Sequence, residues 1–368
     1  MDKYLKLIQS IIPDFNSNDI EQSFINLGVD SIDLVSIRVE FERHLGSPIS
    51  DNDWTSFQSF KQLIEYSNTS QQAFTPEQRT VLTLHKTLNI NMPQMAIESL
   101  SENWLFKEIG SIHWELLCQG LGVESNQIQD EMGNRLYATF VRIKFSINTS
   151  LHYFSENEDL QIEGQINRYG GGLYFSDINM ESFNGHNISA SLMTSFSKRG
   201  KDGNKNLVKS QPFVKNNTIN ELKQMPEFGN TYRLLKRGEL NHLTLEKFSF
   251  KLEAQTLFET PYNINAYYDL NGVGLLYFAA YPIISDYCEA QYCNKNYANN
   301  QANFKWEESY FTKSRDILYY ANCDIHETII YKLHFIEFAG NLVSTYSALY
   351  RKSDKQVMAK IFTIKNKK

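Results

Sequence analysis

A single serine stands between two aspartates in the stretch LGVDSIDLVSIRVEFER, where a helical apolar pattern begins. Ser31 is therefore expected at the N-terminus of a helix, where free backbone N–H groups and the positive end of the helix dipole stabilise an anion. Two roles fit such a hydroxyl. Ser31 either caps the helix, as serine often does, or carries a group that must be held at an exposed turn.

The N-terminal part of the chain has the pattern of a small helical bundle. Apolar residues recur at helical spacing in residues 4–12 and 34–41, and two shorter helices are expected before residue 67. A polar stretch that ends in proline, SNTSQQAFTP, follows and is typical of a linker. We therefore expect an all-α domain of four helices at 1–68 and a linker at 69–78.

Beyond this linker, apolar and polar residues alternate as in half-buried antiparallel strands. One long helix interrupts the strands, with Ser101 placed to cap it and Gly120 or Gly122 placed to end it. The same order of elements returns, with a second long helix expected at 271–292. The pattern predicts an α+β fold of two fused hot-dog units. Their expected bounds are 79–198 and 246–368, joined by a surface connector at 199–245.

The composition argues against several classes of protein. The net charge is −6 without a long basic block, so the counterion release that drives nucleic-acid binding has no source. No stretch approaches the roughly 18 apolar residues of a membrane span. The four cysteines lack metal-ligand spacing, and the glycine run 170–172 lacks the lysine of a phosphate loop and indicates a strand bend. We expect a cytoplasmic protein that binds no metal, no membrane and no nucleic acid.

The first 68 residues resemble an acyl or peptidyl carrier protein. The resemblance is carried by Leu27, Gly28, Asp30, Ser31 and Leu34. It implies that Ser31 carries 4′-phosphopantetheine, attached by a phosphopantetheinyl transferase, and that the acidic helix after Ser31 is the docking face for partner enzymes. A phosphodiester suits the electropositive start of a helix.

Residues 92–361 resemble the leinamycin-type bifunctional acyltransferase/decarboxylase family, which has a double hot-dog fold. The blocks that match are LSENWLFKEIGSIHWELLCQGLG, GNRLYATFVRIKF, INRYGGGLYFSD, LMTSFSKRG, DLNGVGLLYFAAYP and YRKSDKQVMA. The resemblance implies an enzyme that takes methylmalonyl (or malonyl) from coenzyme A, decarboxylates it and leaves propionyl (or acetyl) on carrier phosphopantetheine. It also implies partners in polyketide biosynthesis, either a polyketide synthase or the enzymes of β-branching.

The same resemblance implies that a tyrosine carries the acyl group, and Tyr137 in RLYATF matches this position best. A phenol with a reference pKa of about 10 is a poor nucleophile unless a cation or hydrogen-bond donors stabilise its phenolate. In a strand, Arg135 shares the face of Tyr137 and Arg142 lies on the other, so Arg135 is the better candidate cation. The alternative is that protonated Tyr137 donates a hydrogen bond or a proton to the enolate.

Five further residues are candidates for catalysis, each with a competing structural role. Asp269 and Asn271 resemble the Asp or Asn that opens the central helix of hot-dog thioesterases, where the competing role is capping. Ser101 and Asn103 occupy the equivalent opening of the first long helix. His113, in that helix, is either a base or thioester donor, or a structural histidine with satisfied hydrogen bonds.

The first hypothesis is therefore a carrier protein that is charged by its own acyltransferase/decarboxylase, within one chain or between the chains of a homodimer. One alternative is a hot-dog thioesterase or dehydratase that acts on the tethered acyl chain. Another is a docking module without chemistry. A dehydratase requires a cleft histidine that faces an Asp or Glu, and the sequence pattern indicates no such pair.

Overall fold

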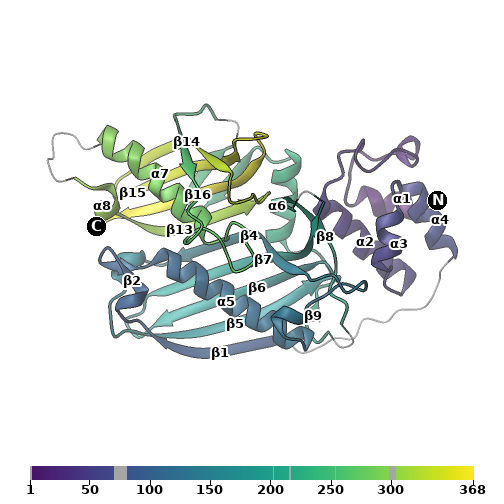
Figure 1. Cartoon of the computed structure of the whole chain (residues 1–368), viewed down its shortest axis with the longest axis horizontal. Coiled ribbons are helices and arrows are strands. Elements are labelled where there is room, and N and C mark those ends of the chain that lie inside the picture. Colours follow the sequence, from purple (N-terminus) through teal and green to yellow (C-terminus); the bar gives the residue numbers. More distant parts are fainter. Residues whose placement is uncertain (1, 70–80, 202, 215–216, 253, 298–303) are drawn as a thin grey trace.

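The computed structural model describes residues 2–69, 81–201, 203–214, 217–252, 254–297 and 304–368. The chain forms a small helical domain at its N-terminus and a large domain built on one antiparallel sheet (Figure 1). The helical domain lies at one end of the molecule, and the C-terminus lies at the other. The expected linker at 69–78 falls outside the described residues except for Thr69.

Four helices form the N-terminal domain, as the sequence predicts. They are α1 (Asp2–Gln9), α2 (Ser31–Leu45), α3 (Asp51–Ser56) and α4 (Phe60–Thr69), with a 3-10 turn at Ser17–Asp19. Tyr4, Ile8, Phe41 and Leu63 are fully buried in its core. Gly46 ends α2 with a φ of 74°, which a residue with a side chain rarely adopts. The domain therefore has an apolar core of its own.

The central sheet of the large domain is built from two similar halves. The first half contains β1 (Leu82–Asn89), β4 (Tyr137–Ile147), β5 (Asp159–Tyr169), β6 (Leu173–Ser182) and β7 (Asn187–Gly200). The second contains β12 (Phe258–Asn263), β13 (Tyr310–Tyr319), β14 (Thr328–Ala339), β15 (Leu342–Arg351) and β16 (Val357–Lys367). Their spatial order is β1-β5-β6-β7-β4-β13-β16-β15-β14-β12. The halves thus mirror each other about the β4–β13 pair, where Ile143 lies opposite Ile317.

Smaller elements connect or border these strands. They are β2 (Met95–Ala96), β3 (Ser99–Leu100), β8 (Gly203–Lys209), β9 (Asn220–Glu221), β10 (His242–Leu245), β11 (Phe248–Lys251), α8 (Trp306–Ser309) and 3-10 turns at Met92–Gln94, Ser125–Gln127 and Leu151–Tyr153. The segment expected as a surface connector, 199–245, therefore contains β8, β9, the helix α6 (Glu227–Arg237) and β10. The segment 245–254, expected to be part of the second sheet unit, contributes β11 to a separate hairpin with β10.

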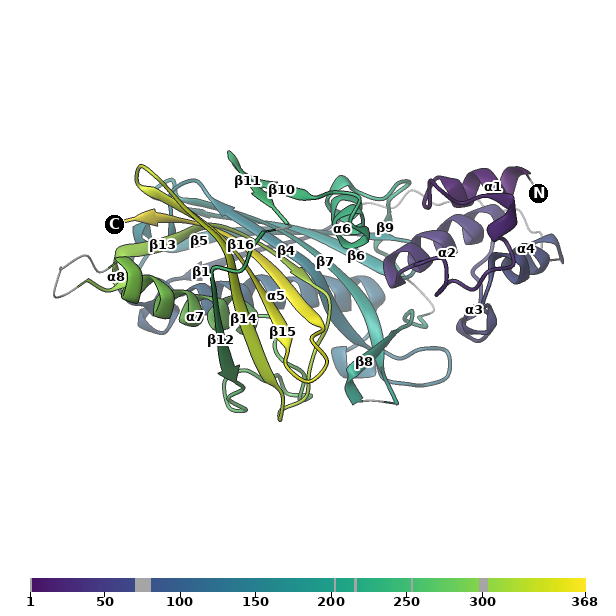
Figure 2. The ribbon, with the colours of Figure 1, turned by 90° about the horizontal axis from the view of Figure 1, so that it is seen from above.

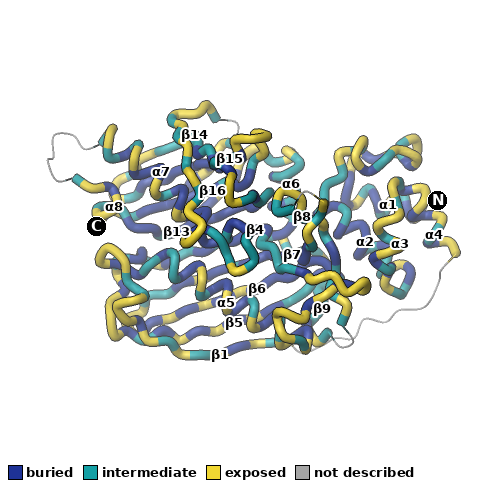
Figure 3. Tube along the Cα trace, in the orientation of Figure 1, coloured by how far each residue is buried: buried dark blue, intermediate teal, exposed yellow. Residues whose placement is uncertain are grey.

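The two faces of the sheet are covered by different elements. The long helices α5 (Glu102–Leu121) and α7 (Ala280–Tyr297) lie on one face, and α6 (Glu227–Arg237) lies on the other beside α2 (Figure 2). Successive strand residues therefore enter different cores: Leu192 packs with the α5 and α7 side, whereas Met193 packs with α6 and α2. Both kinds of residue are buried along the centre of the sheet (Figure 3). In the described part of the chain, none of the helices is long and apolar enough to cross a membrane.

The two long helices agree with prediction to different degrees. Helix α5 begins after Ser101, whose side chain accepts a hydrogen bond from the Trp104 N–H at 3.3 Å, and it ends at Gly122. The second helix does not start at residue 271, as the apolar pattern predicts, but at Ala280. The side chain of Asn271 accepts two backbone N–H groups of the turn that follows, which stabilises a turn where the helix was expected.

Candidate active site between the carrier domain and the sheet

Ser31 is the first residue of α2, and it does not cap this helix. The N-cap is Asp30, whose Oδ1 accepts hydrogen bonds from the backbone N–H groups of Ile32 and Asp33 at 2.6 and 2.9 Å. The Ser31 hydroxyl is thus left for another partner. Its Oγ lies 3.5 Å from Nζ of Lys236 in α6 of the large domain. Capping therefore does not explain this serine.

Helix α2 is also the main surface through which the helical domain contacts the large domain (Figure 2). Its residues Ile32, Val35 and Val39 are buried in one apolar cluster with Leu173 and Phe175 of β6. Removing three aliphatic side chains from water is worth several kcal/mol, at about 1.5–3 kcal/mol each. The apolar face of α2 is therefore covered by the protein's own sheet domain.

A glycine-rich turn allows this close approach. Gly170 and Gly172 lie in the turn between β5 and β6. A Cβ on Gly172 would lie 2.8 Å from Cγ1 of Val35, and one on Gly170, whose φ is +61°, would clash with Cγ2 of Val39. The sequence predicts only a strand bend here. The structure adds a second reason for glycine, which is contact with the docked helix.

Arg43, near the end of α2, makes the main polar contact at one edge of the interface. Its guanidinium donates to the carbonyl oxygens of Leu222 and Lys223 at 2.6 and 2.7 Å. It also lies over the ring of Tyr169, 4.9 Å from the centroid, and the Tyr169 hydroxyl donates to Glu40 of α2. Arg43 thus joins three groups of the large domain to one helix of the N-terminal domain.

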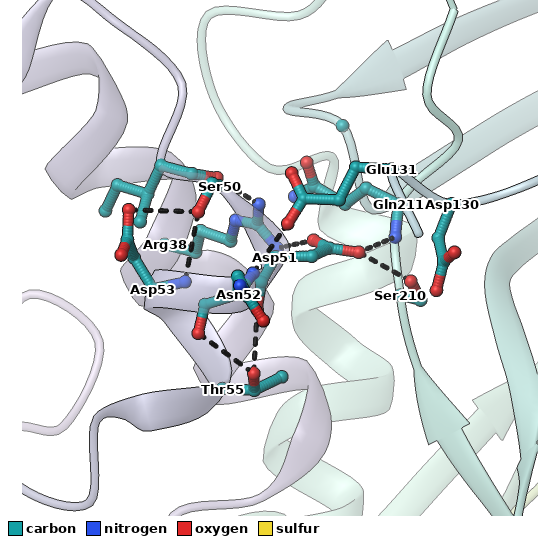
Figure 4. Close-up of polar contacts among 12 residues, drawn as sticks. Arg38, Ser50, Asp51, Asn52, Asp53, Thr55, Asp130, Glu131, Ser210 and Gln211 are labelled. Carbon is teal, nitrogen blue, oxygen red and sulfur yellow. Dashed lines mark hydrogen bonds and ion pairs between the residues drawn. The ribbon is translucent and has the colours of Figure 1, made fainter. Parts of the chain in front are cut away.

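A second polar contact lies at the start of α3 (Figure 4). Asp51 accepts a hydrogen bond from the Ser210 hydroxyl at 2.6 Å and pairs with Arg38 of α2 at 2.7 Å. The backbone N–H of Asn52 donates to Oε1 of Glu131 at 2.6 Å. These contacts hold the start of α3 against Ser210, which follows β8, and Glu131, which precedes β4.

The basic end of α6 faces the acidic start of α2. Lys236 Nζ lies 3.4 Å from Asp30 Oδ2, and Arg237 Nη1 lies 3.7 Å from Asp33 Oδ1. Burial and the charge of Asp30 raise the pKa of Asp33 to about 6, against the lowering effect of Arg237. The two cations are thus placed to stabilise negative charge beside Ser31.

A cavity of about 580 Å³ lies between the two domains, and Ser31 opens into it. Its walls come mainly from α2, α6, β4, β8, the end of β13 and the turns before α7, with single residues from α5, α7 and the 3-10 turn at Ser125–Gln127. Its lining residues include Ser31, Tyr137, Thr139, Lys209, Lys236 and Asn271. The volume is typical of small-molecule sites, which measure about 300–1,000 Å³. Ser31 and Tyr137 therefore share one cavity.

Tyr137, the first residue of β4, lies half-buried in the cavity wall, close to two guanidinium groups. Those of Arg135 and Arg199 lie over its ring, 5.4 and 5.5 Å from the centroid. Arg135 is the cation that the sequence indicates, whereas Arg199 is brought there by the pairing of β7 with β4. Arg142 instead forms a buried ion pair with Asp316 of β13 at 2.6 Å. Positive charge therefore lies close to the phenol.

The cavity lining contains four cations, of which Lys205 pairs with Glu327 at 3.1 Å and Lys236 with Asp30 at 3.4 Å, both carboxylates outside the lining. The four cations are Arg135, Lys205, Lys209 and Lys236. Within the described residues, no aspartate, glutamate or histidine lines it. Because the low dielectric of a protein interior strengthens electrostatic attraction, such a wall favours an anionic ligand. It also lacks the carboxylate or imidazole that most often acts as a general base in hydrolysis.

Lys209 is a site residue that the sequence did not single out. It ends β8, lines the cavity, and donates from Nζ to the hydroxyls of Thr139, at 3.2 Å, and Ser195. Burial, together with the charge of Lys236, lowers the pKa of Lys209 to about 7. The lysine-rich segment around it has the composition of an exposed connector, so no local sequence signal distinguishes this lysine from its neighbours.

His113 lies outside the cavity lining, in the core between α5 and the sheet. Its Nδ1 lies 2.7 Å from Ser176 Oγ and its Nε2 lies 2.8 Å from Thr194 Oγ1. Burial lowers its pKa to about 3, so the ring is neutral near pH 7. Its hydrogen-bonding capacity is therefore used within the core, and we do not include it in the proposed site.

The residues expected to open the two long helices are separated by the structure. Asn271 lines the cavity. Asp269 does not line it, and its carboxylate accepts a hydrogen bond from the Tyr262 hydroxyl at 2.9 Å. Neither opens α7, which corrects the expectation that they begin the second helix. Ser101 caps α5, and Asn103 lies in the first turn of that helix; neither lines the cavity.

The residues around Ser31 fit a phosphopantetheine group. Asp30 Oδ2 is buried without a hydrogen-bond partner, and its nearest cation, Lys236, also lies within 3.5 Å of Ser31 Oγ. Lys236 is thus placed to pair with a phosphodiester attached there, since phosphate oxygens accept strong hydrogen bonds from an ammonium. The same cavity is also lined by Lys209 and Tyr137. When bound, the group supplies a thiol.

Comparisons with known proteins agree with these two domains. Residues 5–67 match the family described as "phosphopantetheine attachment site". The structure of an oleoyl thioesterase from Lactobacillus plantarum is 10% identical, with a TM-score of 0.54, over 78% of this chain and 97% of that one. A 12:0-ACP thioesterase from Umbellularia californica is 10% identical, with a TM-score of 0.50, over 78% and 94%.

At this identity the two structures show the fold alone. Among curated protein sequences, the comparison gives no match. The chain thus consists of an N-terminal carrier domain of the phosphopantetheine-binding type, which implies a 4′-phosphopantetheine group, followed by a large antiparallel sheet domain with the hot-dog fold of thioesterases.

Proposed function

We propose that this chain is a carrier protein fused to its own acyltransferase/decarboxylase, with a double hot-dog fold. It takes malonyl or methylmalonyl from coenzyme A, decarboxylates it, and loads acetyl or propionyl on the phosphopantetheine of Ser31 for polyketide biosynthesis. One observation carries this proposal: a single cavity joins Ser31 to Tyr137, and its described lining contains four cations but no carboxylate or histidine. Such a wall favours a substrate that carries a negative charge.

The reaction requires the chain's own residues to supply a nucleophile and hydrogen-bond donors that stabilise an enolate. The Tyr137 oxygen attacks the thioester carbonyl of the CoA substrate and forms an ester with the acyl group, and CoA leaves as the free thiol, which takes up the proton lost by the phenol. Arg135 and Arg199, on the ring of Tyr137, supply the positive charge that a phenolate nucleophile needs. Loss of CO₂ then leaves an enolate, which donors in the cavity must stabilise. This division of roles follows the family resemblance of Tyr137.

The docked position of the carrier supports loading within one chain. Ser31 opens into the cavity of its own large domain, and the polar contacts of Arg43 and Asp51 hold it there. A short linker holds a domain at an effective concentration near millimolar, which favours this encounter over one between molecules. Mixing a Ser31→Ala chain with a phosphopantetheinylated Tyr137→Phe chain tests the point. We expect no loading of the second chain, whereas rapid loading would indicate transfer between molecules.

A thioesterase that acts on the tethered acyl chain is the second candidate, because the fold is shared with an oleoyl thioesterase and a 12:0-ACP thioesterase. Product analysis separates the two. With malonyl-CoA as substrate, our proposal expects CO₂ and a protein-bound acetyl group. A thioesterase would release free carboxylic acid and leave the thiol of the carrier uncharged. The proposal fails if the free acid forms at the rate at which CoA is released.

A further inference from the structure

Lys209 lies in a row of three directly paired residues on adjacent strands. Tyr137 of β4 is paired with Ser197 of β7, and Ser197 is paired with Lys209 of β8. Directly paired residues point to the same face of a sheet, so Lys209 and Tyr137 share a face with one strand between them. Two strand spacings amount to about 10 Å, a distance that a lysine and a tyrosine side chain can together span.

The ammonium of Lys209 is held by hydroxyl groups and not by a carboxylate. Its hydrogen bonds go to Thr139 and Ser195, and within the described residues no ion pair involves it. The charges that act on it come from two other elements, Lys236 of α6 and Asp30 of the carrier. Hence its positive charge remains available to a ligand in the cavity.

We propose that Lys209 stabilises the enolate formed on decarboxylation and then protonates it, an inference that rests on the proposed function. As the bond to the carboxylate breaks, CO₂ leaves and its electron pair forms the enolate of the acyl group. The Lys209 ammonium donates a hydrogen bond to the enolate oxygen. It then gives one proton to the α-carbon, and the neutral amine regains a proton from water. No oxidant or further reactant is needed.

The other cavity groups fit this role less well. Tyr137 has no proton to give while it carries the acyl group. A guanidinium group such as that of Arg135 does not act as a proton donor in proteins. Lys236 is engaged by Asp30 at the mouth, beside Ser31. Lys209 carries no such constraint, and burial lowers its pKa to about 7, so it exchanges a proton readily near neutral pH.

The test compares Lys209→Met, Lys209→Arg and Lys352→Met, the last being an exposed lysine in the turn after β15 and outside the cavity lining. Each protein is phosphopantetheinylated on Ser31 and incubated with malonyl-CoA, and CO₂ release and intact mass are followed. Lys209→Met should lower decarboxylation by at least about 100-fold, the usual loss for an oxyanion donor, while malonyl still reaches the protein. Lys352→Met should behave as the wild type.

The pH profile provides a readout that a merely structural role would not change. Because the reaction needs protonated Lys209, wild-type decarboxylation should fall as pH rises through about 7. Tyr137 of β4, Arg135 just before β4, Lys205 of β8, and Tyr232 and Lys236 of α6 also line the cavity. Burial raises the pKa of Tyr232 well above its ordinary value of 10, so its ionisation does not contribute to a decline near pH 7. Lys209→Arg keeps its charge, so the decline should move above pH 9, at a lower maximal rate.

Unchanged decarboxylation in folded Lys209→Met, or the same pH profile in Lys209→Arg, would overturn the role of Lys209 and leave the proposed function intact. A wild-type protein that loads malonyl without releasing CO₂ would overturn both. Circular dichroism establishes whether each variant is folded. If Lys209→Met is unfolded, the pH profile of decarboxylation by Lys209→Arg decides whether Lys209 has the proposed role.

Discussion

Lys236 Nζ lies 3.5 Å from Ser31 Oγ, so the attachment serine of the carrier domain is in contact with the domain that we propose to charge it. The contact belongs to an interface in which α2 buries its apolar face against β6 and the glycine turn before it. One helix therefore serves two needs. It must be free while phosphopantetheine is attached, and it must be docked while the carrier is loaded.

Weakening the interface should expose Ser31 to modification. Arg43→Ala removes two hydrogen bonds from a charged group, to the carbonyls of Leu222 and Lys223, each worth about 1.5–3 kcal/mol. We expect a phosphopantetheinyl transferase to modify the variant about ten-fold faster than the wild type, while later loading within the chain becomes slower. Intact mass spectrometry measures both rates. Lys61→Ala, on an exposed carrier surface, is the control, and equal modification rates would contradict a docked resting state.

A methyl group at Gly172, in the turn between β5 and β6, should be tolerated only if α2 moves away from this turn. In Gly172→Ala, the new Cβ would lie 2.8 Å from Cγ1 of Val35, so we expect the carrier to undock. Small-angle scattering should show a larger radius of gyration with little change in the melting of the sheet domain. Adding Val35→Ala removes the clashing methyl and should restore compact scattering. A single variant as compact as the wild type would show that this contact does not control docking.

Substitution of Tyr137 should separate loading from modification. Tyr137→Phe keeps the ring close to Arg135 and Arg199 but removes the oxygen, so we expect phosphopantetheine attachment to be normal and acyl loading to fall at least about 100-fold. In Ser31→Ala, which has no acceptor, the acyl group should remain on the peptide that contains Tyr137. Exposed Tyr153→Phe is the control. Normal loading by Tyr137→Phe would refute a role for the phenol.

Stability should depend on pH through Asp33. Burial and Asp30 raise its pKa to about 6, above the unfolded value of about 3.9, so folding favours the protonated form. The free energy of unfolding should therefore fall as pH rises from about 4 to about 6, by up to about 3 kcal/mol. Asp33→Asn should remove this dependence in urea unfolding, and exposed Asp14→Asn should not. The assignment fails if Asp33→Asn and the wild type share one pH profile.

Local signals in the sequence account for the parts of the fold that were predicted correctly. Capping by Ser101 and termination at Gly122 define α5, and the apolar stripe after Ser31 defines α2. The late start of α7 was missed because the side chain of Asn271 stabilises a turn within an apolar run. A hydrophobic pattern does not indicate that a side chain will bind backbone N–H groups and so prevent a helix from forming.

The site itself depends on contacts that are distant in the sequence. Arg199 and Lys209 reach the cavity because β7 pairs with β4 and with β8. The composition of these segments does not indicate which strands pair. The turn at Gly172 is needed because Val35, more than a hundred residues earlier, packs against it. Single residues such as Ser31 and Tyr137 could be proposed from their motifs, but their shared cavity could not.

The most direct test of the account is the intact mass of the phosphopantetheinylated chain after incubation with malonyl-CoA or methylmalonyl-CoA. We predict that the mass increases by an acetyl group from malonyl-CoA and by a propionyl group from methylmalonyl-CoA, and that Ser31→Ala shows no such addition to phosphopantetheine. A bound group that retains its carboxylate would contradict the decarboxylase activity, and a carrier that stays uncharged would contradict the acyltransferase.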